Sequence, residues 1–261
     1  MDMKGLVGQE IGQTLAGFAS REPVCSAWRS PLVGYARASD PLFERLRHVA
    51  HPGHLLPSDL LESARTVIAF FLPFEGSIPA SNATGTLPSA QWAAAYGETN
   101  ELIARINARL VHVLGSRGYR AVTIPPTHDF DAESLLSAWS HRHVGYIAGL
   151  GTFGLNRLLI TEQGCCGRLG SLVTDLAVAP TPRQEDESCL QRAGLACTAC
   201  LEKCRGNALS ESGFDARACY RVLLDNEARL GMAGRADVCG KCACGLPCSL
   251  TDPARKFRSS S

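Results

Sequence analysis

The sequence predicts an α/β fold followed by a small cysteine-rich module. Three observations lead to this prediction. Residues 1–178 alternate the periodicities of helices and strands, which is the pattern of layered α/β proteins. A proline-rich junction follows at residues 179–182, and nine of the twelve cysteines come after it. We therefore expect two domains, an α/β domain over residues 1–178 and a cysteine-rich domain over residues 179–261.

The first half of the α/β domain is expected to contain two helices and a buried strand. A helix is predicted over residues 3–19, and a short helix over residues 59–64 leads into a strand at residues 66–72. That strand reads Thr-Val-Ile-Ala-Phe-Phe-Leu, a continuous apolar run that is typical of a sheet covered on both faces. Pro73 ends the strand, because proline donates no hydrogen bond to a sheet.

The second half of this domain begins with an amphipathic helix at residues 99–114. Its predicted core face is Leu102, Ile106, Leu110 and Val113, which recur at spacings of four, four and three. The remaining expected elements are a strand at 119–124, a helix at 131–148, and strands at 158–161 and 171–178.

Composition indicates a cytoplasmic globular protein. The chain is 45% hydrophobic and 20% charged, values that fit neither a disordered nor a membrane-spanning protein. Its longest apolar run, residues 67–74, is too short to cross a bilayer, and no apolar signal segment stands at the start. The formal net charge is +1, so no overall positive field attracts RNA, and a tRNA partner is not expected. The basic, serine-rich residues 254–261 are expected to form a frayed terminus.

Eight cysteines of the second domain follow the pattern of two 4Fe-4S clusters. Each such cluster needs four thiolates, and two-cluster ferredoxins send the last cysteine of each run to the other cluster. The Cys-x2-Cys-x3-Cys run at residues 197–204 is the end of such a run, and an earlier cysteine supplies a first ligand across a longer spacer. The predicted ligands of one cluster are Cys189, Cys197, Cys200 and Cys248, and those of the other are Cys204, Cys219, Cys239 and Cys242.

Two other interpretations of these cysteines compete with iron and sulfur. Paired Cys-x2-Cys motifs also bind structural zinc, but a single zinc site would leave four of the eight cysteines unexplained. Disulfides need an oxidising compartment and are usually found in small secreted chains. Within the iron–sulfur interpretation, Cys244 competes with Cys248 as the exchanged ligand, and Pro247 favours Cys248.

A glycine-rich segment at residues 148–154 reads Ala-Gly-Leu-Gly-Thr-Phe-Gly and lies between a predicted helix and a predicted strand. A dinucleotide fingerprint needs the opposite order, with a strand before it and a helix after it, so a nicotinamide site is not expected. Two interpretations of the glycines stay open. They form a C-capping turn, or they let a bound ligand approach the backbone closely.

Residues 146–156, the strand at 158–161 and the order of the cysteines together resemble the epoxyqueuosine reductase family. In that family a similar Ala-Gly-Leu-Gly-aromatic-x-Gly-Lys-Asn-x-Leu-Leu-Ile segment precedes a ferredoxin module. The resemblance extends upstream to residues 67–69 and 118–122 and downstream to residues 215–219. It covers roughly residues 60 to 250, and the order of the cysteines is its most specific part.

This resemblance implies a cobalamin-dependent reductase, with a corrinoid-binding α/β domain and a bacterial-ferredoxin-like module that carries two 4Fe-4S clusters. Reducing a corrinoid cobalt to its nucleophilic form needs a low-potential electron, which thiolate-ligated clusters can supply. Arg157 and Arg168 are further candidates for contacts with the corrinoid or with a substrate anion. The cofactor-binding residues implied by the resemblance are Gly149, Leu150, Gly151, Thr152, Phe153, Gly154 and Asn156.

The chain departs from the family at the position of its proton donor. The family keeps an acidic residue at the end of the strand that matches residues 119–124, whereas this chain has Ile124 there. Substitute catalytic donors a few residues on are His128, Asp129 and Asp131. Asp131 also fits the N-cap of the predicted helix 131–148, which is the interpretation we favour.

Three further departures from the family's sequence make a shared substrate less expected than a shared fold. The family's Asp-Tyr-His segment is represented by residues 96–99, which read Tyr-Gly-Glu-Thr. Arg205 follows Cys204, where ferredoxin runs commonly place proline. The helical repeats that bind tRNA in many family members are not expected after the clusters.

The other cysteines and two histidines have ordinary alternatives to a functional role. Cys165 and Cys166 are adjacent, so a disulfide between them would be strained, and they are expected to be buried free thiols or pocket thiols. Cys25 has no partner in sequence and is expected to be packed. His141 and His143 are two residues apart on a predicted helix, so they point in different directions and do not bind one metal together.

The sequence therefore predicts a cytoplasmic α/β reductase that uses two 4Fe-4S clusters and cobalamin to reduce a small or nucleoside-like substrate. Its expected partner is a low-potential electron donor of the ferredoxin or flavodoxin type, with no membrane involved. One alternative is an electron-transfer protein that reduces the corrinoid of a partner enzyme and has no organic substrate of its own. Another is a zinc-bearing binding module.

Overall fold

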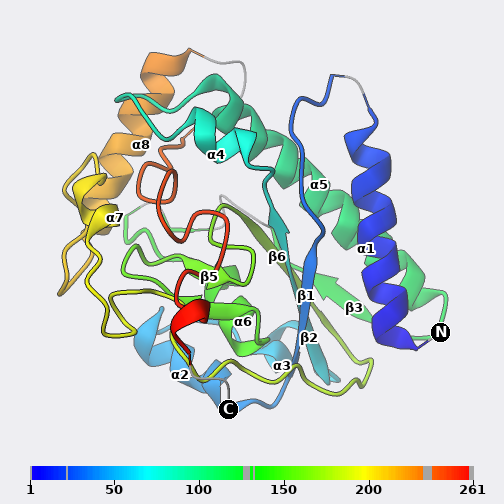
Figure 1. Cartoon of the computed structure of the whole chain (residues 1–261). Helices are drawn as coiled ribbons and strands as arrows, with labels where there is room; N and C mark the ends of the chain where they lie inside the picture. The colour runs from blue at the N-terminus through cyan, green and yellow to red at the C-terminus, as the bar shows by residue number, and fades with distance from the viewer. Residues whose placement is uncertain (1, 22, 126–129, 132, 232–236, 259–261) are drawn as a thin grey trace.

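The structure, a computed structural model, describes residues 2–21, 23–125, 130–131, 133–231 and 237–258. At its centre is a four-stranded antiparallel sheet with the strand order β1-β2-β6-β3 (Figure 1). A second, two-stranded sheet pairs β4 with β5. The strands are β1 (Leu32–Arg37), β2 (Thr66–Pro73), β3 (Ala121–Thr123), β4 (Gly151–Phe153), β5 (Leu159–Thr161) and β6 (Gly167–Thr174).

Strand β2 is buried along its whole length because helices cover both faces of the central sheet, as its sequence predicts. Ile68, Phe70 and Leu72 point into one core cluster, together with α1 and α5. The alternate residues Val67 and Phe71 point into the other, together with α2 and α6. Alternation along a strand sends successive side chains to opposite faces, so this one strand anchors both halves of the core.

The helices that form these layers are α1 (Met3–Ala19) and α5 (Ala90–Gly115) on one face, and α2 (Pro41–Val49) and α6 (His141–Ile147) on the other. Figure 1 shows α1 and α5 side by side. The other helices are α3 (Pro57–Leu60), α4 (Ser77–Ser81), α7 (Ala199–Glu202), α8 (Ala216–Leu230) and the 3-10 helix η1 (Arg255–Phe257). Among the described residues, no helix is long and apolar enough to span a membrane.

Most of the predicted elements are present, and the α/β class is confirmed. The first helix has its predicted bounds, and the predicted core face of α5 is buried. The predicted helix at 131–148 is wrong for residue 131 and residues 133–140, since among the described residues of this range the helix is α6, from His141 to Ile147. Asp131 instead opens a turn, in which Leu135 has φ +59° and the Asp131 backbone N–H donates to Leu136. Several elements were not predicted from the sequence, namely β1, α2, α4, β4, α7, α8 and η1.

The cysteine-rich region shares its core with the α/β part. Cys200 and Leu246 belong to the same buried cluster as Phe70 on the central sheet. The proline-rich junction is held against β1, where Thr181 exchanges hydrogen bonds with the backbone of Tyr35 at 2.8 and 3.1 Å. The division into two domains at residue 178 therefore stays a prediction.

The last described residues are bonded to the body of the protein. The Arg258 guanidinium donates to the buried Asp252 carboxylate at 2.7 Å and to the Glu187 carbonyl at 3.1 Å. Ala254 is also buried. The prediction of a frayed terminus is thus wrong for residues 254–258, because an ion pair and apolar packing both fix them.

Candidate functional site

Four of the cysteines line one cavity beside β5. The cavity contains about 330 Å³ of space that protein atoms do not fill, part of it open to solvent, and its wall contains Cys189, Cys197, Cys200 and Cys248. The rest of the wall is mainly apolar, from Leu155, Ile160, Leu190, Ala199, Leu246, Pro247 and Pro253. Residues that lie 59 positions apart in the chain therefore meet around one space.

Short elements hold these four cysteines in place. Cys200 lies in the single-turn helix α7, and Cys197 precedes it. The Cys189 sulfur accepts a hydrogen bond from the Leu155 backbone N–H at 3.5 Å. Next to it, the Ser188 N–H donates to the Thr152 hydroxyl at 2.8 Å, which ties this loop to β4. Burial, followed by the nearby sulfurs of Cys248, Cys189 and Cys197, raises the pKa of Cys200 to about 11.

The remaining four predicted ligands form a second group around α8. Cys219 lies in the first turns of that helix, and Cys204 follows α7. Burial, followed by the nearby thiols of Cys239 and Cys204, raises the pKa of Cys219 to about 11. Burial, followed by Cys239, Cys219 and Cys204, raises the pKa of Cys242 to about 12. The Cys204 sulfur accepts a hydrogen bond from the Ala208 N–H at 3.2 Å.

Geometry bears on the choice between a cluster and a single metal ion. In a tetrahedral zinc site each sulfur lies at about 2.3 Å from the metal, which places neighbouring sulfurs about 3.8 Å apart. Among the residues that the structure describes, no three His, Cys, Asp or Glu side chains lie close enough together to hold one metal ion. A four-iron cluster is larger and keeps its thiolates farther apart than a single zinc ion does, and the choice between the two stays a prediction.

Cationic side chains surround the second group more closely than the first. Arg142 on α6 lies near Cys219 and Cys242, and one of its N–H groups donates to the Arg157 carbonyl at 2.9 Å. Lys241 and Arg205 lie near Cys239. The Lys241 ammonium is itself held by Asn82 and by the Thr84 carbonyl. The sequence pattern did not single out Arg142 or Lys241, because their proximity to the cysteines is set by tertiary packing.

Cys244 and Cys248, which compete for one ligand position, lie in different surroundings. Cys248 lines the cavity, whereas Cys244 is fully buried and its sulfur accepts a hydrogen bond from the Asn82 side chain at 3.5 Å. Cys166 also contacts Cys244. This placement favours Cys248 over Cys244 as a ligand.

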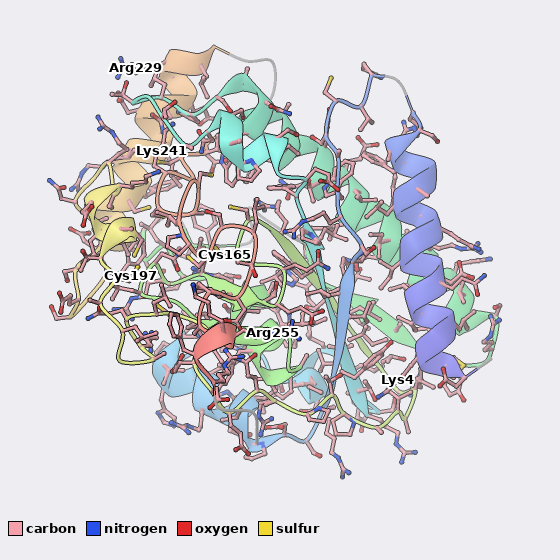
Figure 2. All side chains as sticks on the ribbon, in the orientation of Figure 1. Lys4, Cys165, Cys197, Arg229, Lys241 and Arg255 are labelled. Carbon is pink, nitrogen blue, oxygen red and sulfur yellow. The ribbon has the colours of Figure 1, made fainter. Side chains whose placement is uncertain are left out.

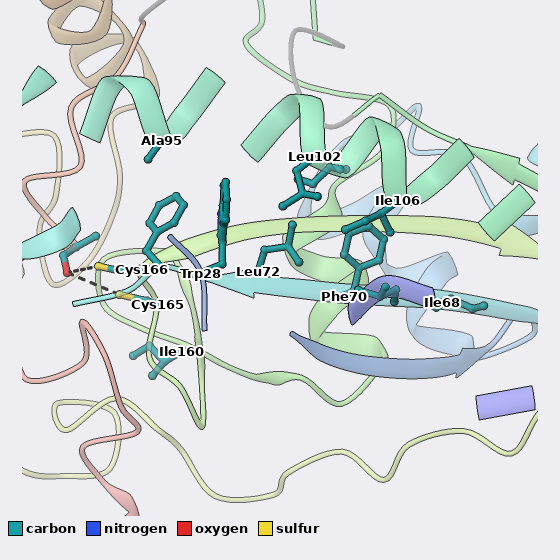
Figure 3. Close-up of a cluster of buried hydrophobic side chains, with 14 of the residues drawn as sticks. Trp28, Ile68, Phe70, Leu72, Ala95, Leu102, Ile106, Ile160, Cys165 and Cys166 are labelled. Carbon is teal, nitrogen blue, oxygen red and sulfur yellow. Dashed lines mark hydrogen bonds between the residues drawn. The ribbon is translucent and has the colours of Figure 1, made fainter. Parts of the chain in front are cut away.

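Cys165 and Cys166 are both buried free thiols at the start of β6. Figure 3 shows their sulfur atoms joined to one carbonyl oxygen, that of Ala243, at 4.0 and 3.1 Å. Figure 2 places Cys165 in the middle of the molecule, between the sheet and the cysteine-rich segment that contains Cys197. Cys25 is exposed rather than packed, so that prediction is wrong.

The chain's own atoms occupy the space beside the glycines of residues 149–154. A Cβ atom at Gly151 would overlap the Ile160 carbonyl, because β4 and β5 pair closely there. At Gly149, which has φ +78°, a Cβ atom would lie 2.7 Å from the Pro182 carbonyl. At Gly154 it would lie 2.5 Å from the Asn156 side chain. Packing within the protein thus accounts for these glycines, and their predicted contact with a cofactor stays a prediction.

The other predicted cofactor residues of this segment are occupied by contacts within the protein. Leu150 is in the core, Thr152 accepts the Ser188 hydrogen bond, and the Phe153 ring packs 4.9 Å from the His143 ring. Asn156 lines the cysteine cavity, and its amide donates to the Cys242 carbonyl at 3.0 Å. Asn156 therefore connects the two cysteine groups, a role that the sequence did not indicate.

Of the three predicted proton donors, only Asp131 lies in the part of the chain that the structure describes. His128 and Asp129 lie outside the described residues, and Ile124 is buried in the apolar core. Asp131 is exposed and accepts a hydrogen bond from the Ser134 N–H at 2.7 Å, and this bond holds its pKa below the usual value. A carboxyl with a lowered pKa is ionised at neutral pH, so Asp131 is better suited to capping the turn than to donating a proton.

The two histidines of α6 have different partners, as their spacing predicts. His141 pairs with the Ser171 hydroxyl at 2.8 Å and the Pro125 carbonyl at 2.9 Å. His143 pairs with the Ser140 hydroxyl at 2.7 Å. Burial, followed by the charge of Arg142 and then His54, lowers the pKa of His143 to about 4.

Comparison with known proteins gives a clear result for the fold. No family model matches the chain, and no curated protein matches it. Among solved structures, an epoxyqueuosine reductase from Streptococcus thermophilus superposes with a TM-score of 0.59 at 18% identity, covering 97% of this chain and 70% of that one. An epoxyqueuosine reductase with an epoxyqueuosine-modified tRNA-Tyr stem loop gives 0.56 at 18% identity, with 96% and 70% covered.

A more distant likeness is to a reductive dehalogenase whose structure suggests a mechanism for B12-dependent dehalogenation. Its TM-score is 0.50 at 19% identity, with 81% of this chain and 28% of that chain covered. At these sequence identities the likeness establishes the fold but not the reaction, which must be argued from the residues of the site. The fold of this chain is that of the epoxyqueuosine reductases, as its sequence motifs indicate.

Proposed function

We propose that this protein is an iron–sulfur oxidoreductase that holds two 4Fe-4S clusters and works with cobalamin to reduce a small or nucleoside-like substrate. The observation that carries the proposal is the cavity lined by Cys189, Cys197, Cys200 and Cys248. These are the four ligands that the sequence predicts for one cluster from cysteine spacing, with Pro247 favouring Cys248 over Cys244. The likeness in fold to reductases, one of them described in terms of B12-dependent chemistry, supports the reaction class.

The residues around the cysteines fit such clusters. A 4Fe-4S cluster supplies one electron at a time, and hydrogen bonds to its sulfurs and the exclusion of water set its reduction potential. Here apolar side chains line much of the cavity, and backbone N–H groups of Leu155 and Ala208 donate to the sulfurs of Cys189 and Cys204. We further propose that residues 179–261 act as the ferredoxin-like electron-transfer part and receive electrons from a ferredoxin or flavodoxin type of donor.

The proposal that this protein works with cobalamin rests on the likeness in fold alone. When bound, it would supply a low-valent, nucleophilic cobalt. Residues 149–154 do not offer it an open backbone surface, because side chains and carbonyls of this protein fill the space beside the glycines. No step is therefore assigned to those residues.

A second candidate function is that of an electron-transfer protein that reduces the corrinoid of a partner enzyme. Two observations favour it. Ile124 is buried and apolar where the family keeps its acid, and the glycine segment is packed against the chain itself.

The test is anaerobic purification followed by metal analysis and a visible spectrum with and without added cobalamin. Iron and acid-labile sulfide should each reach roughly eight per chain, since two four-iron clusters are proposed. Stoichiometric zinc without sulfide would overturn the iron–sulfur assignment. A spectral change on adding cobalamin supports the reductase, and clusters without such a change support the electron-transfer alternative.

A further inference from the structure

Lys241 carries a buried ammonium group between two predicted ligands of the second cluster. It follows Cys239 by two residues and directly precedes Cys242. The residue is only 3% exposed, so its charge is removed from solvent. Its ammonium donates to the Asn82 backbone carbonyl at 3.0 Å, to the Asn82 side-chain oxygen at 3.1 Å and to the Thr84 carbonyl at 2.7 Å. A neutral amine has only two N–H groups, so three acceptors fit the charged form.

All three acceptors of Lys241 are neutral. Among the residues that the structure describes, no carboxylate forms an ion pair with this ammonium. Burying a charge is costly unless an opposite charge compensates it. The hydrogen bonds use every N–H group of the ammonium, but they leave its charge without a negative partner among the side chains of acids. The thiolates of a bound cluster would supply that negative charge.

Asn82 holds the ammonium next to the cysteine segment. The Asn82 side chain is fully buried, and its amide N–H groups donate to the Cys239 carbonyl at 2.9 Å and to the Cys244 sulfur at 3.5 Å. Its oxygen accepts the hydrogen bond from Lys241. The ammonium and the backbone of Cys239 are therefore partners of the same side chain. This arrangement fixes the positive charge beside a predicted ligand.

A fixed positive charge affects the two redox states of a cluster unequally. A four-iron cluster with four thiolates is negatively charged, and it becomes more negative when it takes up an electron. A nearby cation therefore stabilises the reduced state more than the oxidised state, which raises the reduction potential. Water and salt screen a buried charge less than an exposed one, so burial makes the effect larger.

We propose that Lys241 is a positioning residue whose buried ammonium balances the negative charge of the cluster bound by Cys204, Cys219, Cys239 and Cys242 and raises its reduction potential. This inference rests on the proposed function, because it requires that cluster. The wall of the cavity assigned to the other cluster contains no lysine or arginine. The effect is therefore confined to one of the two clusters.

The test is a redox titration of the anaerobic full-length protein, followed by electron paramagnetic resonance. Lys241→Met and Lys241→Gln remove the charge, and Lys241→Arg keeps it. One of the two cluster potentials should shift to a more negative value in the Met and Gln variants and should stay near the wild-type value in the Arg variant.

Lys203→Met is the matched control. The Lys203 ammonium donates to the Ala83 carbonyl at 3.2 Å and to the Cys244 carbonyl at 3.0 Å, so it joins the same two segments of the chain. Lys203 is only partly buried, and solvent screens its charge. Its loss should therefore shift the potential less than the loss of Lys241. An equal shift in Lys203→Met would mean that attachment of the loop sets the potential, which would overturn the inference.

Iron and sulfide content separates failure of this inference from failure of the proposed function. Wild-type protein without iron and sulfide would remove the proposed function itself. Two clusters with unchanged potentials in Lys241→Met and Lys241→Gln would overturn the inference and leave the function standing. The same negative shift in Lys241→Arg, or loss of the cluster in all three Lys241 variants, would show that the side chain only packs and would also overturn it. Loss of the cluster in the Met and Gln variants with retention in Lys241→Arg would support the balance of charge.

Discussion

Cys204 is the residue at which the interleaved assignment of ligands differs most from a simple reading of the sequence. It follows Cys197 and Cys200 in one run, yet it lies with Cys219, Cys239 and Cys242. The cavity wall that contains Cys197 and Cys200 does not include Cys204. The short helix α7 separates the two environments, since Cys200 lies within it and Cys204 follows its end.

Replacing Cys204 with Ser should therefore damage the cluster bound by Cys219, Cys239 and Cys242 and spare the other one. The hydroxyl of serine is a much weaker ligand for iron than a thiolate. Iron and sulfide should fall to roughly half, and the remaining resonance signal should match that of the spared cluster. Cys25→Ser serves as the control, since Cys25 is exposed and lies far along the chain from the ligands. Selective loss of the cluster anchored by Cys197 and Cys200 would refute the interleaved order.

His143 makes stability depend on pH in a defined window. Its pKa is lowered to about 4, from a usual value of 6.5, mainly by burial. Between these values the unfolded chain binds a proton that the folded chain does not, so this contribution is present above pH 6.5 and is lost as the pH falls towards 4. The expected loss from pH 7 to pH 5 is up to about 2 kcal/mol.

The check is urea unfolding of wild type and His143→Gln at pH 7 and pH 5. Glutamine keeps a hydrogen-bonding group for Ser140 but does not titrate. The difference in the free energy of unfolding between the two pH values should be smaller in the variant. Equal differences in the two proteins would mean that His143 does not carry this pH dependence.

At the scale of the element, the β4–β5 hairpin is the part of the fold with least room for change. Gly151 pairs with Thr161, and its Cα faces the Ile160 carbonyl. This hairpin also presents Leu155, Asn156 and Ile160 to the cysteine cavity. Close pairing of the two strands therefore fixes one wall of the cavity.

Gly151→Ala should destabilise the protein by about 2 kcal/mol or more, because the added methyl group would overlap a backbone carbonyl. Gly97→Ala is the matched control. Gly97 lies within α5 with open space beside it, so alanine should stabilise the protein by about 0.5–1 kcal/mol through helix propensity. Thermal unfolding of the two variants and of wild type measures both effects. A Gly151→Ala protein as stable as wild type would show that the hairpin can relax.

Elements with a strong local signal were predictable from the sequence, and those without one were not. The run at residues 66–72 and the spacing of Leu102 and Ile106 give β2 and α5 because burial requires such patterns. The strand β1 contains Gly34, which is needed because the Ala148 carbonyl lies against it, and glycine weakens a strand signal. The predicted helix at residue 131 failed because one aspartate suits a turn as well as a helix N-cap.

At the scale of the whole molecule, the candidate site depends both on residues that are close in sequence and on contacts between segments that are far apart in sequence. Cysteine spacing predicts which residues bind iron, since ligands of one run are close in sequence. The contacts of Cys165 with Cys248 and of Asn156 with Cys242 join segments that are far apart in sequence. The spacing of cysteines along the chain could therefore not predict these contacts. For the glycines of residues 149–154, the sequence pattern is compatible with a bound ligand close to the backbone. In the folded protein, other residues of the chain fill the space beside these glycines.

We expect the protein to be a poor epoxyqueuosine-tRNA reductase despite its fold. The likeness to an epoxyqueuosine reductase covers 97% of this chain, but the resemblance places the family's acid position near Ile124, which is apolar and buried. General acid catalysis needs a donor within hydrogen-bond reach of the leaving oxygen. Binding tRNA also needs clustered cations, and the formal net charge is only +1.

The assay is reduction of epoxyqueuosine in tRNA with cobalamin and a strong reductant, beside an authentic family enzyme. Turnover at least about a hundredfold lower than that of the family enzyme is expected, on the scale of a lost general acid. Comparable turnover would contradict this prediction. In that case the variants Asp129→Asn and His128→Gln would show which substitute donor supplies the proton.

The walls of the cysteine cavity come from segments that are made at different times. Leu155 and Ile160 belong to the hairpin, Cys189 and Cys200 follow, and Leu246 to Pro253 close the space from the other side. During translation at about 5–20 residues per second, the earlier thiols leave the ribosome several seconds before Cys248 does. Over that interval the chain has most of the proposed cluster site but lacks its last wall. Completion of the pocket, and any cluster insertion that depends on it, therefore waits until the segment around Cys248 has emerged and pairs with residues 165–166.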